Sequence, residues 1–137
     1  MDRFIPMHQH LLIKATIRQP LNDLALFKSM LIDLVNKLGM VAVTAPQGHY
    51  VDTLGNEGIT GSINLATSHI AMHIWDHDHR LMADIYSCCP FDNDSIVEYL
   101  GTFFGGYEEI DYMVINRDTF EVIETYSSVE ELPCIDI

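Results

Sequence analysis

The feature that most constrains the fold of this chain is an alternation of apolar and polar residues between Thr67 and Cys89. The stretch reads T-S-H-I-A-M-H-I-W-D-H-D-H-R-L-M-A-D-I-Y-S-C-C and holds four of the seven histidines and two of the three cysteines. Successive side chains of a β-strand point to opposite faces of a sheet. The stretch therefore predicts two strands that are joined by a polar turn at residues 76–79 and share one apolar face. The opposite face carries a polar and reactive set, which comprises His69, His73, Asp84 and Cys88.

Periodicity elsewhere in the chain predicts the other elements. Apolar residues at helical spacing predict two helices, at residues 24–38 and 96–104. The first helix has Asn22 or Asp23 as its expected N-cap and Gly39 as its expected end. The segment 45–57 is rich in glycine and is expected to be a loop. Further strands are expected at residues 8–17, 40–44, 59–66, 109–116 and 120–125.

Two helices and at least five strands, with few connections of the parallel type, indicate an α+β fold. We expect one domain, residues 1–137, built as a two-layer α/β sandwich. Its sheet should be mainly antiparallel, with both helices on the apolar face. The other face should then carry His10, His69, His73, Asp84 and Cys88.

Charge and composition narrow the classes of function. The formal net charge of −13 argues against nucleic-acid binding, which needs a basic surface. It fits a small cationic ligand, and it fits plain solubility equally well. No apolar run reaches the roughly 20 residues that span a bilayer, and the first ten residues lack the order of a signal peptide. With three cysteines, two of them adjacent, free thiols in a reducing cytoplasm are expected.

The polar set between Thr67 and Cys89 allows two interpretations from its residue types. A zinc site could use His69, His73, His77 and His79 with a cysteine, but structural zinc sites usually have tighter paired spacings. Alternatively, the histidines are ordinary surface residues and both cysteines are small buried hydrophobes. For any single residue, this second interpretation is the better one. It is weaker for the whole set, because all of these polar residues fall on one face of adjacent strands.

The same stretch also carries a family resemblance. T-S-H-I-A-M-H-I-W followed by M-A-D-I-Y-S-C resembles the bacterial S-adenosylmethionine decarboxylases, which have E-S-H-L-x-I-H-T-W-P-E and then A-x-V-D-x-[FY]-[ST]-C-G. Upstream, G-I-T-G-S-I-N-L-A-T-S resembles the family's G-V-S-G-x-x-x-I-x-E-S, and H-L-L-I-K resembles its first strand. Element order agrees from residue 8 to about residue 116. The combination of motifs, with its spacing kept, is a specific signal.

The resemblance implies a self-cleaving proenzyme that makes its own cofactor. Ser68 would attack the carbonyl of Thr67, and elimination would then split the chain into residues 1–67 and 68–137 and leave a pyruvoyl group at position 68. The family's processing residues fall on Thr60 and His73, whose side chains would stabilise the oxyanion. The pyruvoyl ketone would bind the substrate amine as a Schiff base and accept the electron pair left by carbon dioxide. Cys88 would return a proton, and no metal is implied.

One difficulty is visible in the sequence itself. Ser68 and His73 are five residues apart, so a regular strand places their side chains on opposite faces. Their cooperation in one chain requires a bend or bulge just after Ser68, or a strand that begins after Ser68.

The residues that would read the substrate depart from the family pattern. Thr67 stands where glutamate is common, and Cys89 stands where the family has glycine. The family's P-E becomes Asp76–His77, which removes a carboxylate that would hold ribose hydroxyls, unless Asp76 replaces it. An aromatic that stacks on adenine falls on Leu54, unless Tyr50 takes that role. The substrate contacts implied by the resemblance are thus Leu54, Trp75, Asp76 and His77.

These departures leave three hypotheses for the function. The first is an S-adenosylmethionine decarboxylase of polyamine (spermidine) biosynthesis, acting as a homodimer whose sheets share an active-site region. The second is a pyruvoyl decarboxylase for arginine or ornithine, which would need no ribose or adenine contacts. The third is an unprocessed homologue that acts as a binding or regulatory protein.

Overall fold

The structure is a computed structural model that describes residues 7–129. In chain order, the elements are β1 (Gln9–Ile17), α1 (Leu24–Leu38), β2 (Gln47–Val51), β3 (Gly58–Leu65), β4 (Ser68–Trp75), β5 (Arg80–Ser87), α2 (Asn93–Phe103), β6 (Tyr107–Asn116) and β7 (Glu121–Ser127). None of the helices in this part of the chain has both the length and the apolar character needed to cross a membrane.

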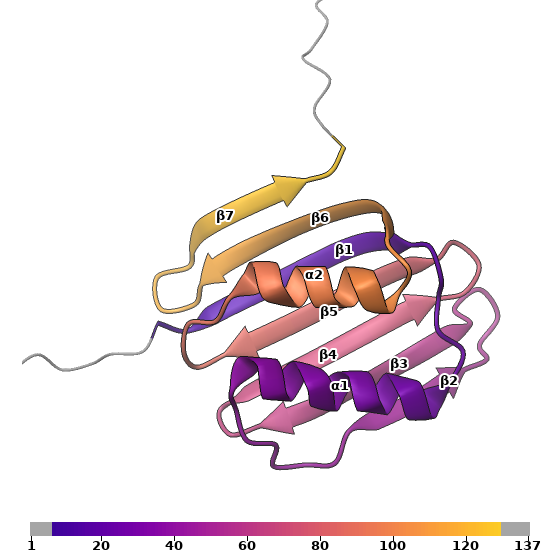
Figure 1. Cartoon of the computed structure of the whole chain (residues 1–137), viewed down its shortest axis with the longest axis horizontal. Helices are drawn as coiled ribbons and strands as arrows, with labels where there is room; N and C mark the ends of the chain where they lie inside the picture. Colours follow the sequence, from indigo (N-terminus) through magenta and orange to yellow (C-terminus); the bar gives the residue numbers. More distant parts are fainter. Residues whose placement is uncertain (1–6, 130–137) are drawn as a thin grey trace, which may run out of the picture.

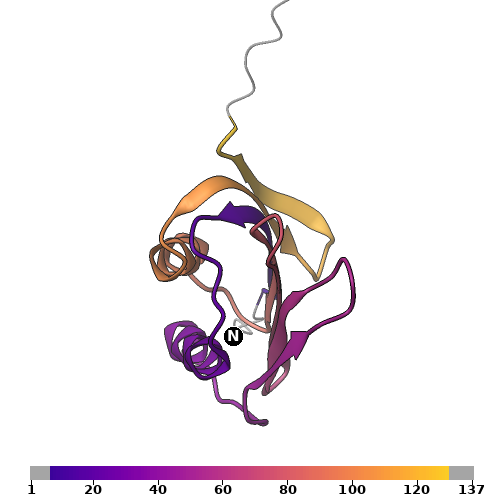
Figure 2. The same ribbon diagram turned by 90° about the vertical axis from the view of Figure 1, so that its right-hand side faces the viewer.

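All seven described strands form one sheet in the order β2-β3-β4-β5-β1-β6-β7, and every neighbouring pair is antiparallel. Both helices lie on the same side of this sheet (Figures 1 and 2). The fold class predicted from the sequence, a two-layer α+β sandwich with an antiparallel sheet, is therefore confirmed. We call the side of the sheet away from the helices the open face.

The core forms between the helices and one face of the sheet, as the alternation predicts. Along β4, Ile70, Met72 and Ile74 are buried, whereas His73 between them is exposed. The N-cap of α1 is Asp23, whose carboxylate accepts a hydrogen bond from the Leu26 N–H at 3.1 Å. Gly39 ends α1 with a left-handed φ of 68°. The buried stripe of α1 comprises Phe27, Met30, Leu31, Leu34, Val35 and Leu38.

One prediction about the strands was wrong. Residues 40–44 form no strand beyond a single bridge between Ala42 and Leu65, and the strand β2 lies inside the expected loop. Val41 and Val43 are 71% and 62% exposed, so these two apolar residues are not part of the core. The position of β2 is instead set by pairing with β3, from Gln47 opposite Ser62 to Val51 opposite Gly58.

Phe27 fixes α1 onto these strands and is fully buried. Its ring lies so close to β3 that a Cβ atom at Gly61 would be 2.2 Å from it. We expect Phe27→Ala to lower the free energy of unfolding by about 3–5 kcal/mol, because it removes a buried ring and leaves a cavity. The neighbouring Leu26 is 51% exposed, so Leu26→Ala is the control and should change stability by less than about 0.5 kcal/mol. Urea unfolding of the two variants measures the difference, and equal losses would contradict this view of the core.

Candidate active site

The turn between β3 and β4 contains a strained residue. Leu65 pairs with Ser68, so the turn consists of Ala66 and Thr67 alone. Thr67 has a φ of 60°, a left-handed conformation that is a genuine outlier for a β-branched residue. Its hydroxyl donates a hydrogen bond to the Ala66 carbonyl at 2.6 Å. Strain of this kind persists only where the surroundings enforce it, and it is common at functional sites.

Ser68 begins β4 directly after this strained residue and is buried, with 7% of its surface exposed. It alternates with Ile70 and so faces the helices. Its Oγ accepts a hydrogen bond from the backbone N–H of Cys88 at 2.9 Å. The turn between β3 and β4 and the end of β5 therefore meet at this serine.

Cys88 follows β5 and is partly exposed. The hydroxyl of Thr67 is the main cause that lowers the pKa of the Cys88 thiol. Burial is the second-largest cause and opposes this shift, and Ser68 and Cys89 add smaller lowering effects. The structure thus brings three of the residues singled out in the sequence together at one end of the sheet. We call Thr67, Ser68 and Cys88 the cleavage corner.

Thr60 and His73 form a second group. They are register partners on β3 and β4, and the Oγ1 atom of Thr60 lies 3.1 Å from Nδ1 of His73. The His73 side chain is exposed on the open face. We call Thr60 and His73 the open-face pair.

The cleavage corner and the open-face pair do not meet within this chain. The register between β3 and β4 runs without a shift from Leu65 opposite Ser68 to Gly58 opposite Trp75. Five residues of regular strand separate Ser68 from His73 by about 17 Å, and the two side chains point to opposite faces. Cooperation of Ser68 and His73 in one chain would require a bend just after Ser68 or a strand that begins after Ser68. The structure has neither feature, because β4 begins at Ser68 and is regular.

The residues expected to read the substrate lie at the far end of β4, about 23 Å from Ser68. Tyr50 donates a hydrogen bond from its hydroxyl to the Asp76 carboxylate at 2.7 Å, which raises the pKa of the tyrosine. Trp75 donates to the Asn56 side chain at 3.2 Å. The guanidinium of Arg80 lies 4.4 Å from the centre of the Trp75 ring. These contacts make a defined cluster of Tyr50, Trp75 and Asp76.

Leu54 and His77 are placed differently. Leu54 is 93% exposed in the loop between β2 and β3. His77 lies in the turn after β4 and has Nε2 at 3.6 Å from the carboxylate of Asp78. Neither residue has a contact that ties it to the cluster of Tyr50, Trp75 and Asp76. Sequence reasoning gave Tyr50 only a secondary role, although its hydroxyl is the group that holds Asp76.

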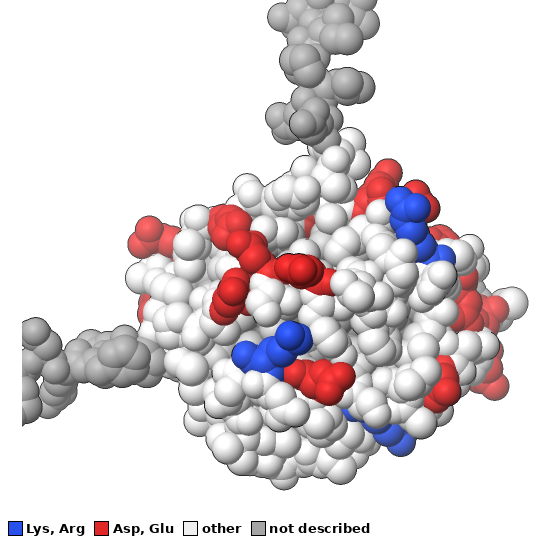
Figure 3. All heavy atoms as spheres, in the orientation of Figure 1, with Lys and Arg blue, Asp and Glu red and all other residues white. Residues whose placement is uncertain are grey.

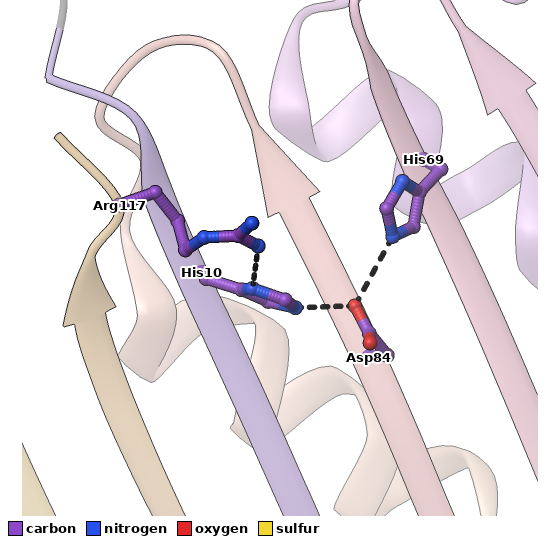
Figure 4. A network of polar contacts seen from close by, with 4 residues as sticks. All are labelled: His10, His69, Asp84 and Arg117. Carbon is purple, nitrogen blue, oxygen red and sulfur yellow. Dashed lines mark hydrogen bonds and ion pairs between the residues drawn. The ribbon is translucent and has the colours of Figure 1, made fainter. Parts of the chain in front are cut away.

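A polar network lies on the open face at the end of the sheet that holds the cleavage corner (Figure 4). Asp84 on β5 contacts two histidines through Oδ1, with His10 Nε2 at 2.5 Å and His69 Nε2 at 3.3 Å. Arg117, in the turn after β6, donates to Nδ1 of His10 at 2.8 Å. The alternation in the sequence predicted three members of this network. It gave no signal for Arg117, which is 107 positions away from His10 along the chain.

Within residues 7–129, one set of side chains has donor atoms spaced for a metal ion, namely His10, His69 and Asp84. Arginine can only donate hydrogen bonds, so Nδ1 of His10 is the acceptor for Arg117. The proton of the His10 ring is then on Nε2, which donates a hydrogen bond to the Asp84 carboxylate. A metal at Nε2 would require a proton on Nδ1, which would then face the donor of Arg117. This arrangement holds a proton better than a metal. The alternative zinc set is not assembled, because His77 lies at the opposite end of β4 from His69.

The electrostatics of this network allow a test by pH. Burial alone raises the pKa of Asp84. The hydrogen bond from His10 and the positive charge that this ring carries when doubly protonated, followed by the same effects of His69, outweigh burial and lower the pKa of Asp84 below the ordinary value of 3.8. A lowered native pKa contributes stability that is complete above the unfolded-state pKa and is lost as the pH falls through the native pKa. We therefore expect wild type to exceed Asp84→Asn in free energy of unfolding at neutral pH, and the difference to shrink in acid. Urea unfolding of both proteins across that pH range measures it, and a difference independent of pH would contradict the assignment.

The open face also carries a groove of about 590 Å³, with largely apolar walls. Leu12, Met82 and Met113 line it together with His73 and Asp84, so it links the open-face pair to the network. The helix-covered side looks different, because acidic side chains gather over α2 there (Figure 3). This helix has Asp92 as its N-cap and Asp94 in its first turn. The apolar hollow is thus on the face that the helices leave uncovered.

Comparison with known proteins adds the following findings. A model of the S-adenosylmethionine decarboxylase family matches residues 9–118, which leaves β7 outside the matched part. Two curated relatives described as S-adenosylmethionine decarboxylase proenzyme come from the Langeland and Okra strains of Clostridium botulinum. Each is 30% identical over 71 residues, which make up 51% of this chain. The match spans only 61% of the length of these relatives.

A solved structure has the same fold. The adenosylmethionine decarboxylase from Aquifex aeolicus VF5 aligns with a TM-score of 0.66, over 82% of this chain and 91% of that one. The sequences are 19% identical, so the likeness concerns the arrangement of the elements.

Proposed function

Because this chain belongs to the S-adenosylmethionine decarboxylase family, we propose that it is a pyruvoyl-dependent decarboxylase that cleaves itself between Thr67 and Ser68. The cleavage yields residues 1–67 and residues 68–137. The observation that carries this proposal is the cleavage corner, where a strained β-branched residue precedes a buried serine. A strained peptide next to a held hydroxyl is the arrangement that an attack on the backbone requires.

The chemistry of cleavage follows from these contacts. Ser68 Oγ attacks the carbonyl carbon of Thr67, and the amide becomes an ester. The N–H of Cys88 holds this hydroxyl oxygen in one position. Loss of the Ser68 α-proton then breaks the bond between Cβ and Oγ of Ser68, which frees the Thr67 carboxylate and leaves a dehydroalanine at position 68. Water hydrolyses the imine tautomer of this residue, which releases ammonia and leaves a ketone at the new chain end. The left-handed φ of Thr67 raises the energy of the intact turn, so breaking the chain there relieves strain.

A serine at the cleavage corner fits a pyruvoyl group, because the three carbon atoms of that group are those of the serine. When formed, it supplies an electron-accepting ketone for decarboxylation. Cys88 lies beside Ser68 and is the proton donor of the proposal. In the intact chain the pKa of this thiol is lowered, chiefly by the Thr67 hydroxyl, and a proton donor works best when its pKa approaches the working pH.

A second copy of the chain completes the site in this proposal. The cleavage corner and the open-face pair lie about 17 Å apart along one strand. Two open faces packed together about a two-fold axis, crossing β4 near Ile70 and Ala71, would place the strand end that holds the cleavage corner of one subunit beside His73 of the partner subunit. The apolar groove on the open face supports such packing, because homodimer interfaces are rich in apolar surface. We therefore propose a homodimer in which each site takes residues from both subunits.

The proposed substrate is S-adenosylmethionine, whose decarboxylated product serves polyamine (spermidine) synthesis. The net charge of −13 favours a cationic substrate. In the proposed dimer, the partner subunit's cluster of Tyr50, Trp75 and Asp76 lies beside the cleavage corner and offers an aromatic surface and a carboxylate, which can replace the groups missing at Leu54 and His77. No metal is proposed. Arginine or ornithine is the second candidate, because neither needs ribose or adenine contacts.

Release of labelled carbon dioxide from each substrate tests this choice. We expect purified protein to release carbon dioxide from S-adenosylmethionine and not from arginine or ornithine. Turnover of either amino acid without turnover of S-adenosylmethionine would overturn the substrate assignment and leave the cleavage proposal standing. Denaturing electrophoresis of the same sample distinguishes a self-cleaved enzyme from an unprocessed binding protein. The enzyme gives two fragments, whereas the unprocessed protein gives a single band of full length.

A further inference from the structure

We propose that Cys88 and Cys89 form a reversible oxidation site, in which a hydroperoxide converts the two adjacent thiols into a vicinal disulfide. Both cysteines are free and partly exposed in the described part of the chain. The effect of this oxidation on decarboxylation rests on the proposed function, but the oxidation chemistry does not.

The backbone after β5 holds the two thiols in place. The Ser87 hydroxyl donates to the Cys89 carbonyl at 2.6 Å and accepts from the Cys89 N–H at 3.2 Å. It also lies 3.7 Å from the Cys89 sulfur. Ser87 itself is buried, with 1% of its surface exposed, so it anchors this turn firmly. These contacts fix the backbone of Cys89 and hold its sulfur near Ser87.

The surroundings of Cys88 favour the reactive form of its thiol. The polar side chain of Thr67 lowers the pKa of the Cys88 thiol most, burial opposes it, and Ser68 and Cys89 add smaller effects, so the net shift favours the thiolate. The thiolate is the form that reacts with peroxides, and reactive cysteines are partly exposed with a lowered pKa. Cys89 directly follows Cys88 in the chain, so the second thiol belongs to the residue next to the one that would be oxidised.

The reaction balances with a hydroperoxide as the oxidant. The Cys88 thiolate attacks the terminal oxygen of the hydroperoxide, the O–O bond breaks, and an alcohol or water leaves. The resulting sulfenic acid at Cys88 is attacked by the Cys89 sulfur, which forms the S–S bond and releases water. Two electrons pass from the two thiols to the hydroperoxide, and both thiol protons end on oxygen. An external thiol reductant reverses the reaction.

The disulfide formed here would be easy to reduce. Adjacent residues joined by a trans peptide have Cα atoms about 3.8 Å apart. Ordinary disulfides join Cα atoms roughly 4.4–6.8 Å apart, and departures from this geometry strain the bond. Strained disulfides have the higher reduction potentials that are typical of labile or regulatory bonds. The oxidised state would therefore be temporary in a reducing compartment.

Oxidation would switch off the proposed enzyme, because Cys88 in a disulfide has no proton to donate. Cys89 occupies the position where the related motif has glycine, so Cys89→Gly is the natural control and removes only the second thiol. In that variant, the sulfenic acid at Cys88 has no neighbour to condense with. Continued peroxide would then carry it to the sulfinic acid, which thiol reductants do not restore.

The test compares two proteins that both carry Cys134→Ser, so that residues 88 and 89 hold the only cysteines. Each is treated with hydrogen peroxide and then with dithiothreitol, and intact mass and free thiols are measured. In the protein with both cysteines, we expect loss of two hydrogen atoms, loss of both thiols, and full recovery. In the Cys89→Gly protein, we expect gain of two oxygen atoms and no recovery.

Persistence of both free thiols under peroxide would overturn the proposal, as would a disulfide between chains in place of one within a chain. The mass measurement needs no decarboxylation, so it is informative even if the protein turns over none of the substrates. Where carbon dioxide release is observed, it should vanish on oxidation and return to its starting rate with dithiothreitol only when Cys89 is present.

Discussion

Replacing Ser68 with alanine is expected to leave the chain intact at 15.6 kDa, whereas we expect the wild-type protein to split into residues 1–67 and 68–137. Alanine has no hydroxyl to attack the Thr67 carbonyl, so the strained turn stays in place. We expect the rate of splitting to fall by at least about 10³-fold, as is typical when a reaction loses its nucleophile. Denaturing electrophoresis and intact mass during prolonged incubation measure this rate.

Ser29 provides the matched control for this experiment. It is an exposed serine on α1, far from the cleavage corner, and Ser29→Ala should split at the wild-type rate. Splitting of Ser68→Ala at the same position would show that another group attacks the backbone. Failure of the wild-type protein itself to split would reject the pyruvoyl proposal and favour an unprocessed binding protein.

Two variants that fail separately are expected to restore cleavage when they are produced together. In the proposed dimer, each site takes Ser68 and Cys88 from one subunit and Thr60 and His73 from the partner subunit. A dimer of Ser68→Ala with His73→Ala therefore contains one site with all four residues intact. With random pairing, about half of the His73→Ala chains should split, and no Ser68→Ala chain should. Different affinity tags on the two chains identify the products by electrophoresis.

The double variant Ser68→Ala,His73→Ala, produced together with the wild-type chain, is the control for this design. Every mixed dimer then lacks one residue at each site, so splitting of the wild-type chain should fall by about half. If each chain instead built its own site, the wild-type chain would split fully in this mixture. Intact His73→Ala chains in the first mixture would contradict the shared site without affecting the assignment of Ser68.

Local patterns in the sequence accounted for most of the fold. The alternation between Thr67 and Cys89 placed Ile70 in the core and His73 outside, because strand geometry fixes which side chains share a face. The apolar stripe and the caps at Asp23 and Gly39 located α1 closely. The family resemblance drawn from the motifs is confirmed by the match over residues 9–118.

The position of β2 was the part of the fold that local patterns missed. The apolar residues Val41 and Val43 resemble a strand but remain exposed. The segment that does form β2 contains Gly48, and glycine has a low intrinsic preference for strands. The helix α1 packs closely on this strand, because a Cβ atom at Gly48 would lie 3.1 Å from the Phe27 ring. Glycine is thus suited to this strand for a reason that only packing supplies.

The sequence by itself determined the faces of the strands, the helices, the family and the candidate residues, because these follow from local periodicity and from motif spacing. Only the tertiary structure decided which candidates meet. It brought Cys88 to Ser68 and Arg117 to His10, and it kept Ser68 and His73 on opposite faces of one regular strand. The physical reason is that strand pairing and register are set by contacts between residues distant in the chain, and these contacts leave no periodic signal in the sequence.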